Sequence, residues 1–121
     1  MKTAVQTING MLDLLDGPEK WIRHVSAKDG NGYEVNPHHP EAVSWCLAGA
    51  LAVVFDFKET MLSRPSWAQD VIDFLGKRAA FDSEREGIMP LPVYNDEVCR
   101  DYEDMRMFLK RALLEAEELN I

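Results

Sequence analysis

The sequence predicts a mainly α-helical single domain over residues 1–121, with four helices around a central apolar helix and one small β-hairpin. The stretch from Ala42 to Phe55 contains no charged residue, although the segments on both sides of it are rich in charge. A helix that is apolar on every side must be covered by protein. The chain of 121 residues is 46% hydrophobic and 28% charged, which is typical of one globular domain.

The N-terminal third predicts a helix followed by a hairpin. Residues 3–16 repeat apolar side chains at helical spacing, namely Val5, Ile8, Leu12 and Leu15. Gly17 and Pro18 end this pattern, because neither residue continues a helix well. An Asp-Gly and an Asn-Gly pair then provide the positive φ angles of a tight reversal, so we expect a β-hairpin over about 21–36.

The central helix is predicted over about 40–55. Pro40 and Glu41 suit a first helical turn, since proline lacks the amide that is unpaired there and glutamate favours the positive end of the helix dipole. Glycine inside a helix is about 1 kcal/mol less favourable than alanine. We therefore expect Gly49 to allow the close approach of another backbone. A third helix is predicted from Ser66 onward.

The final helix is predicted over about 95–119, with Asn95 or Asp96 as its N-cap. Its apolar residues alternate at spacings of four and three, and they are Val98, Tyr102, Met105, Leu109, Ala112 or Leu113, and Ala116. Such a stripe packs either on the core of its own chain or on a second copy. A homodimer through the final helix is therefore one expectation.

Charge indicates which partners the protein favours. The net charge is −8 and the isoelectric point is near 4.8, so the field repels nucleic-acid phosphates and anionic membranes and attracts a basic protein partner. Only Cys46 and Cys99 are present, and they form no Cys-x-x-Cys pair. No apolar run reaches the roughly twenty residues that a bilayer requires. We expect a reduced, cytoplasmic protein.

Three short motifs carry a resemblance. They are Trp21 with the Asp29-Gly30 turn, the Pro-Glu-Ala-Val-Ser-Trp-Cys-Leu-Ala-Gly-Ala-Leu segment that starts at Pro40, and the Tyr-Asn-Asp triplet that starts at Tyr94. In this order they resemble a family of small bacterial and bacteriophage proteins known only as a domain of unknown function. The resemblance implies a shared fold and a bacterial or phage source, and it implies no activity.

Few residues qualify as catalytic or metal-binding groups. Cys46 is the candidate nucleophile, with His24 and Asp96 as the groups that would assist it. The alternative is that Cys46 is a buried cysteine that acts as a small hydrophobic residue. The second residue of the Asn95–Asp96 pair could line a pocket, because capping accounts for only one of the two. The three histidines and two cysteines lack the spacing of a zinc site, so we expect no metal and no cofactor.

Acidic residues provide the more informative pattern. Glu115, Glu117 and Glu118 lie at the C-terminal end of the final helix, where the helix dipole favours cations. Together with the other acids of the second half they predict an anionic binding surface, and these are Asp82, Glu84, Glu86, Glu103 and Asp104. The first functional hypothesis is a non-enzymatic binding module, such as a phage inhibitor that covers a basic, nucleic-acid-binding surface of a host protein. The second is a small enzyme or ligand-binding domain with a pocket near Cys46, Asn95 and Asp96.

Overall fold

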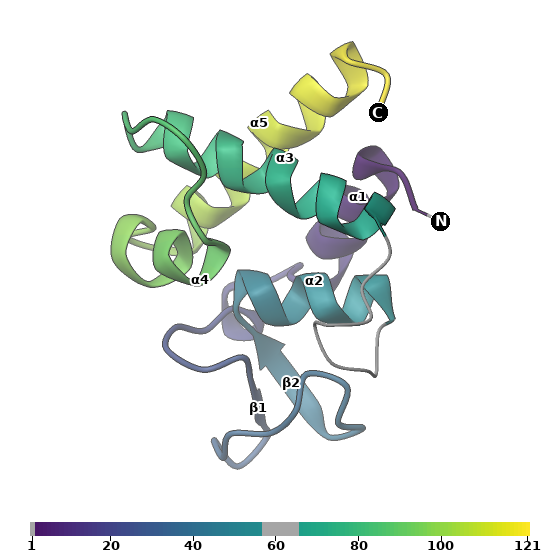
Figure 1. The fold of residues 1–121 in the computed structure, drawn as a ribbon. Helices are drawn as coiled ribbons and strands as arrows, with labels where there is room; N and C mark the ends of the chain where they lie inside the picture. The colour runs from purple at the N-terminus through teal and green to yellow at the C-terminus, as the bar shows by residue number, and fades with distance from the viewer. Residues whose placement is uncertain (1, 57–65) are drawn as a thin grey trace.

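The computed structural model describes residues 2–56 and 66–121 (Figure 1). In chain order the elements are α1 (Ala4–Leu14), the 3₁₀ turn η1 (Pro18–Lys20), β1 (Ala27–Asp29), β2 (Ala42–Trp45), α2 (Leu47–Phe55), α3 (Ser66–Asp82), α4 (Leu91–Val93), the π-helical turn η3 (Tyr94–Val98) and α5 (Tyr102–Glu118). The predicted fold class is confirmed in its main feature, a helical protein with one small antiparallel sheet. Among the described residues, no helix is both long and apolar enough to cross a membrane.

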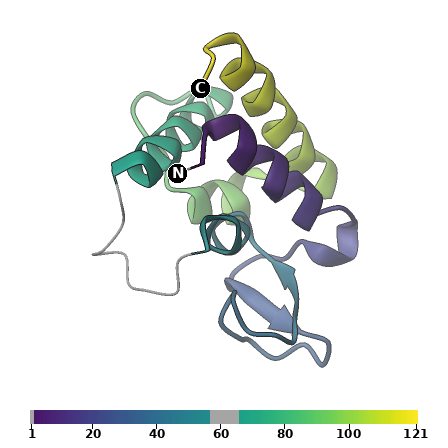
Figure 2. The same ribbon diagram turned by 90° about the vertical axis from the view of Figure 1, so that its right-hand side faces the viewer.

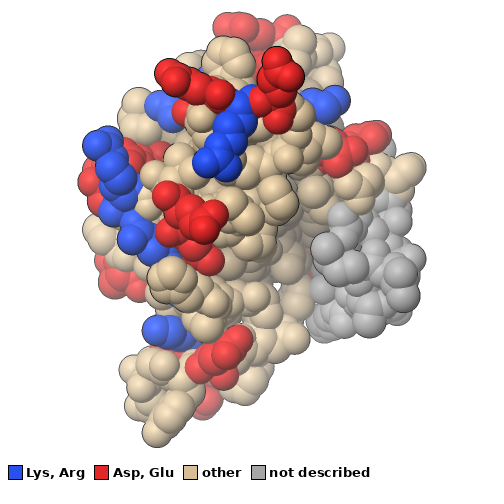
Figure 3. All heavy atoms as spheres, turned by 60° about the vertical axis from the view of Figure 1, so that its left-hand side comes forward, with Lys and Arg blue, Asp and Glu red and all other residues tan. Residues whose placement is uncertain are grey.

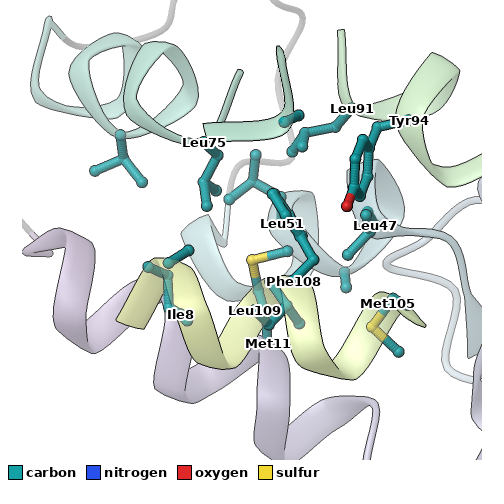
Figure 4. Packing of buried hydrophobic residues seen from close by; sticks show 14 of the residues in the cluster. Ile8, Met11, Leu47, Leu51, Leu75, Leu91, Tyr94, Met105, Phe108 and Leu109 are labelled. Atoms are coloured by element: carbon teal, nitrogen blue, oxygen red, sulfur yellow. The ribbon is translucent and has the colours of Figure 1, made fainter. Parts of the chain in front are cut away.

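Helix α1 contacts most of the other helices. It packs against α5, α2 and α3, and in Figure 2 it lies beside α5 with α2 below. Helix α2 packs mainly on α1 and α4, so the predicted arrangement of four helices around one central helix is not confirmed. The buried side chains form one cluster, in which the rings of Tyr94 and Phe108 lie 4.5 Å apart (Figure 4).

The apolar stretch at 42–55 divides into a strand and a helix, which corrects the predicted helix over 40–55. Residues 42–45 form β2, and the helix begins only at Leu47. Val43 is exposed while Ser44 is buried, which is the alternation of a strand, and valine and tryptophan both favour strands. Cys46 is the N-cap, because its Sγ accepts a hydrogen bond from the Gly49 amide at 3.3 Å.

The predicted hairpin over 21–36 also needs correction. A tight turn is present, since the Asp29 amide donates to the Tyr33 carbonyl at 2.9 Å. Beyond it only Lys28 and Glu34 form a bridge. The two-stranded sheet instead joins β1 to β2, with Ala27 opposite Trp45. Asp29 pairs with Ala42, 13 residues further along the chain, and the local turn signals on which the prediction rested contain no information about a partner at that separation.

The final helix begins later than the predicted residue 95. Its N-cap is Asp101, whose side chain accepts from the Asp104 amide at 2.9 Å, and residues 94–98 form the separate turn η3. Most of the predicted apolar stripe faces the core of this chain, with Met105, Leu109, Ala112 and Ala116 buried. A homodimer through this helix would therefore have to use its outward side, which exposes Met107 and Leu114.

Candidate functional site

Asn95 is the centre of a buried hydrogen-bond network. Its side chain has no exposed surface, and its Oδ1 accepts from the Trp21 indole at 2.7 Å and from the Leu47 amide at 3.0 Å. Its Nδ2 donates to the Ile22 carbonyl at 3.0 Å and to Asp96 Oδ1 at 2.9 Å. Both acceptor positions and both donor positions are used, as a buried amide requires. The network joins η3 to the start of α2 and to the segment after η1.

Asp96 holds the backbone of the segment before β1. Its Oδ1 accepts from the His24 amide at 2.9 Å, and its Oδ2 lies 3.8 Å from His24 Nδ1. His24 has a φ of 73°, an uncommon conformation for a residue with a side chain, and this hydrogen bond stabilises it. Partial burial of Asp96 opposes ionisation, but the hydrogen bonds from His24 and Asn95 outweigh it and lower the pKa of Asp96.

Gly49 shows why the strand-to-helix junction tolerates glycine inside a helix. A Cβ at this position would lie 2.1 Å from the Ser26 carbonyl oxygen, which is far inside any allowed contact. The Cys46 amide donates to the same carbonyl at 3.2 Å. The predicted close approach of a second backbone at Gly49 is therefore present, and the second backbone is the segment that leads into β1.

The structure shows the surroundings of the three candidate catalytic residues, Cys46, His24 and Asp96. His24 and Asp96 lie side by side, yet Asp96 binds the backbone amide of His24, and the His24 side chain is 77% exposed. Cys46 is 6% exposed, and burial raises the pKa of its thiol. A neutral thiol is a poor nucleophile, so the position of Cys46 suits capping better than catalysis. Within the described residues no three His, Cys, Asp or Glu side chains are grouped as metal ligands.

Three of the eight predicted anionic residues are held in ion pairs. Asp82 binds Arg78 at 2.9 Å and Arg111 at 3.1 Å, and its side chain is only 7% exposed. Glu115 also binds Arg78, at 3.0 Å. Asp104 binds Arg100 at 2.9 Å, and the hydrogen bonds from Arg100 lower the pKa of Asp104. Asp82 and Glu115 join α3 to α5, Asp104 pairs locally with Arg100, and all three contribute little free negative charge.

The other five predicted acids are exposed, and within residues 2–56 and 66–121 none of them forms an ion pair. They are Glu84, Glu86, Glu103, Glu117 and Glu118. In the view of Figure 3, acidic and basic side chains alternate instead of forming a single acidic patch. The negative surface is thus narrower than the sequence predicted, and its clearest part is the last turn of α5.

Sequence reasoning missed a groove. It lies between α3 and the end of α5 and has a volume of about 600 Å³. Phe74 and Phe81 line it, and Phe74 is half-buried and also packs against the core. Trp67, Phe74 and Phe81 are each seven residues apart, and that heptad spacing is the signal that could have identified an aromatic edge on α3.

Comparison of the chain with known proteins identifies its family. The model of a family of unknown function, DUF6197, matches residues 1–114, so the chain belongs to this family. No curated protein and no solved structure matches the chain. The residues by which the sequence resembled a family of unknown function, Trp21, the Cys46–Gly49 segment and Asn95–Asp96, are those that the hydrogen-bond network connects.

Proposed function

We propose that the protein is a non-enzymatic binding module that recognises a basic protein partner through the outward side of α5. The observation that carries the proposal is the composition of that side. Met107 and Leu114 are 46% and 61% exposed, and the exposed Lys110 and Arg111 lie between them. The exposed Glu117 and Glu118 follow Leu114 at spacings of three and four residues. Residues at such spacings are neighbours on a helix. Apolar side chains rimmed by charge are typical of an interaction surface.

Energetics support a role for these glutamates outside folding. The last turn of α5 contains no basic residue, so Glu117 and Glu118 stand at the negative end of the helix dipole. Each such placement disfavours the helix by about 0.3–1 kcal/mol. Within the part of the chain that the structure describes, neither glutamate has an ion pair to offset this. A basic partner would supply the missing cations.

A partner of this kind would resemble a nucleic-acid-binding protein in its charge. The net charge of −8 adds a long-range attraction toward basic surfaces, and an acidic side chain can occupy the place of a phosphate. An inhibitor encoded by a bacteriophage, which covers a basic surface of a host protein inside the cytoplasm, is the specific form of this proposal. Blocking such a surface requires no catalytic group.

The test is a comparison of two variants with equal changes in charge. Glu117→Gln with Glu118→Gln removes the acids at the end of α5, whereas Glu34→Gln with Glu41→Gln removes two exposed acids from the region of the sheet. The native protein is used to isolate partners from bacterial lysate, and affinity for each purified partner is then measured over a range of salt. We expect the first variant to weaken binding about tenfold and the control to have little effect. Binding that is insensitive to salt and to the first variant would refute the proposal.

A further inference from the structure

Asn-Gly pairs occur twice in the chain, at Asn9-Gly10 and at Asn31-Gly32. Asparagine is a chemically labile residue, and it loses its amide most readily before glycine, because glycine has no side chain to shield the backbone nitrogen that attacks the asparagine side chain. Both asparagines are exposed, and among the described residues neither side chain has a hydrogen-bond partner. The two pairs therefore differ mainly in the structure of their backbone.

The backbone of the first pair is fixed. Asn9 and Gly10 lie inside α1, where each amide donates to the carbonyl four residues earlier. Gly10 also packs closely on α2, since a Cβ at this position would lie 2.9 Å from Val54 Cγ1. An amide held by helical hydrogen bonding and by packing cannot turn toward the side chain that precedes it. Reaction at Asn9 therefore requires local unfolding of α1.

The backbone of the second pair is open. Asn31 and Gly32 lie in the exposed turn after β1, and no atom of the described residues beyond its two neighbours lies within 4 Å of a Cβ position at Gly32. Gly32 has a φ of 85°, which glycine adopts without strain. Its amide donates to the Asp29 carbonyl at 3.1 Å, and this hydrogen bond has to open before the nitrogen can react. Turns of this kind open far more easily than a packed helix.

We propose that Asn31 is a site of spontaneous deamidation in the folded protein, whereas α1 protects Asn9. The Gly32 nitrogen attacks the carbonyl carbon of the Asn31 side chain, so that a new bond between nitrogen and carbon closes a succinimide ring. The proton of the Gly32 amide passes through water to the side-chain nitrogen, which leaves as ammonia. A water molecule then opens the ring at either carbonyl and gives aspartate or isoaspartate. The reaction is intramolecular and needs no enzyme. This inference is independent of the binding role of Glu117 and Glu118, which lie on α5.

The products change the charge and the length of the turn. Each product adds a carboxylate to a turn that already contains Asp29 and Glu34. Isoaspartate also adds one carbon to the main chain, inside the loop that the Asp29 amide closes by donating to the Tyr33 carbonyl at 2.9 Å. The pairing of β1 with β2 lies outside this loop. The modified protein is therefore folded and more acidic, and anion-exchange chromatography separates it from the native form.

The test follows both pairs in one sample. The native protein is incubated in mildly alkaline buffer made with heavy-oxygen water, then digested in ordinary water, and the peptides are identified by mass spectrometry. Because the solvent oxygen enters the new carboxyl group, products formed during the incubation are distinguished from those formed before or after it. We expect Asn31 to be converted at least about tenfold faster than Asn9, since reacting atoms that are held out of position lose rate steeply.

Unfolding provides the matched control. In urea α1 no longer protects Asn9, so the two pairs should react at similar rates. Asn36 is the negative control in both states, because it precedes Pro37, whose nitrogen has no proton to lose. Asn31→Gln keeps an amide but requires a larger ring, and it should abolish the acidic form. Equal conversion of Asn9 and Asn31 in the native protein would overturn the proposal, as would conversion of Asn31 in urea alone.

Discussion

Replacing Asn95 should remove more stability than any other single polar substitution near the sheet. Asn95→Ala leaves the Leu47 amide buried without its acceptor and deprives the Trp21 indole and the Ile22 carbonyl of their partner. An unsatisfied buried group costs about 1–3 kcal/mol. The Leu47 amide is fully buried, while Trp21 and Ile22 are only half-buried and can regain water. The expected loss in the free energy of unfolding is therefore about 3 kcal/mol.

Urea denaturation followed by tryptophan fluorescence and circular dichroism measures this loss. Asn36→Ala is the matched control, because Asn36 is exposed and accepts one hydrogen bond, from the His38 amide at 2.9 Å. We expect it to lose less than about 1 kcal/mol. Asn95→Asp keeps the shape and the accepting oxygen but loses both donations and places a charge beside Asp96. A loss below about 1 kcal/mol for Asn95→Ala would refute the role of Asn95 as the centre of the network.

Three further predictions concern Gly49, the two cysteines and Asp96. Gly49→Ala should destabilise the protein by about 1–3 kcal/mol in thermal unfolding, because its Cβ would overlap the Ser26 carbonyl. Burial raises the pKa of Cys99 to about 12 and also raises the pKa of Cys46, so both thiols should resist iodoacetamide at pH 8 until the protein unfolds. The pKa of Asp96 is lowered on folding, so its contribution to stability is present at neutral pH and is lost as pH falls through the folded pKa; in Asp96→Asn the loss of stability with acid should be smaller.

Each of these predictions has a clear contrary outcome. Gly30→Ala is the control for Gly49, since no atom lies within 4 Å of its Cβ position, and equal effects of the two substitutions would contradict the overlap. Labelling of Cys46 in the native protein at the rate of a free thiol would restore it as a candidate nucleophile. An Asp96→Asn variant with the same acid dependence as the native protein would show that its hydrogen bonds to His24 and Asn95 contribute little.

Helical elements could be predicted from the sequence more reliably than the sheet. The first helix follows its apolar spacing. Thr3 caps it, because the Thr3 side chain accepts a hydrogen bond from the Gln6 amide and the Gln6 side chain accepts one from the Thr3 amide. The strand at Ala42–Trp45 is hidden because its residues and those of α2 are uncharged throughout, so no change in charge marks the boundary at Cys46. A buried strand and a buried helix are not distinguishable by periodicity over such short runs.

The site was predicted in its members and not in its connections. Asn95 and Asp96 stood out as a polar pair, and one of them was expected to cap the final helix, but Asp101 performs that role. The partners of Asn95 at Trp21 and Leu47 are 74 and 48 residues away, and helical or strand spacing contains no information about contacts at such distances. The groove on α3 was missed for a different reason, since aromatic residues at helical spacing usually face the core.

The geometry separates the residues that maintain the fold from those proposed to bind. Asn95 and Asp96 precede α5, and the helix rises about 1.5 Å per residue, so its far end at Glu118 lies about 25 Å from the cap at Asp101. Substitutions at Asn95 should therefore reduce binding only in proportion to the unfolded fraction. Glu117→Gln with Glu118→Gln should instead reduce binding at unchanged or slightly higher stability, because it removes charge from the negative end of the helix dipole. If the Asn95 variants lose stability and the Glu117 and Glu118 variants lose binding alone, the buried network serves folding and the end of α5 serves recognition.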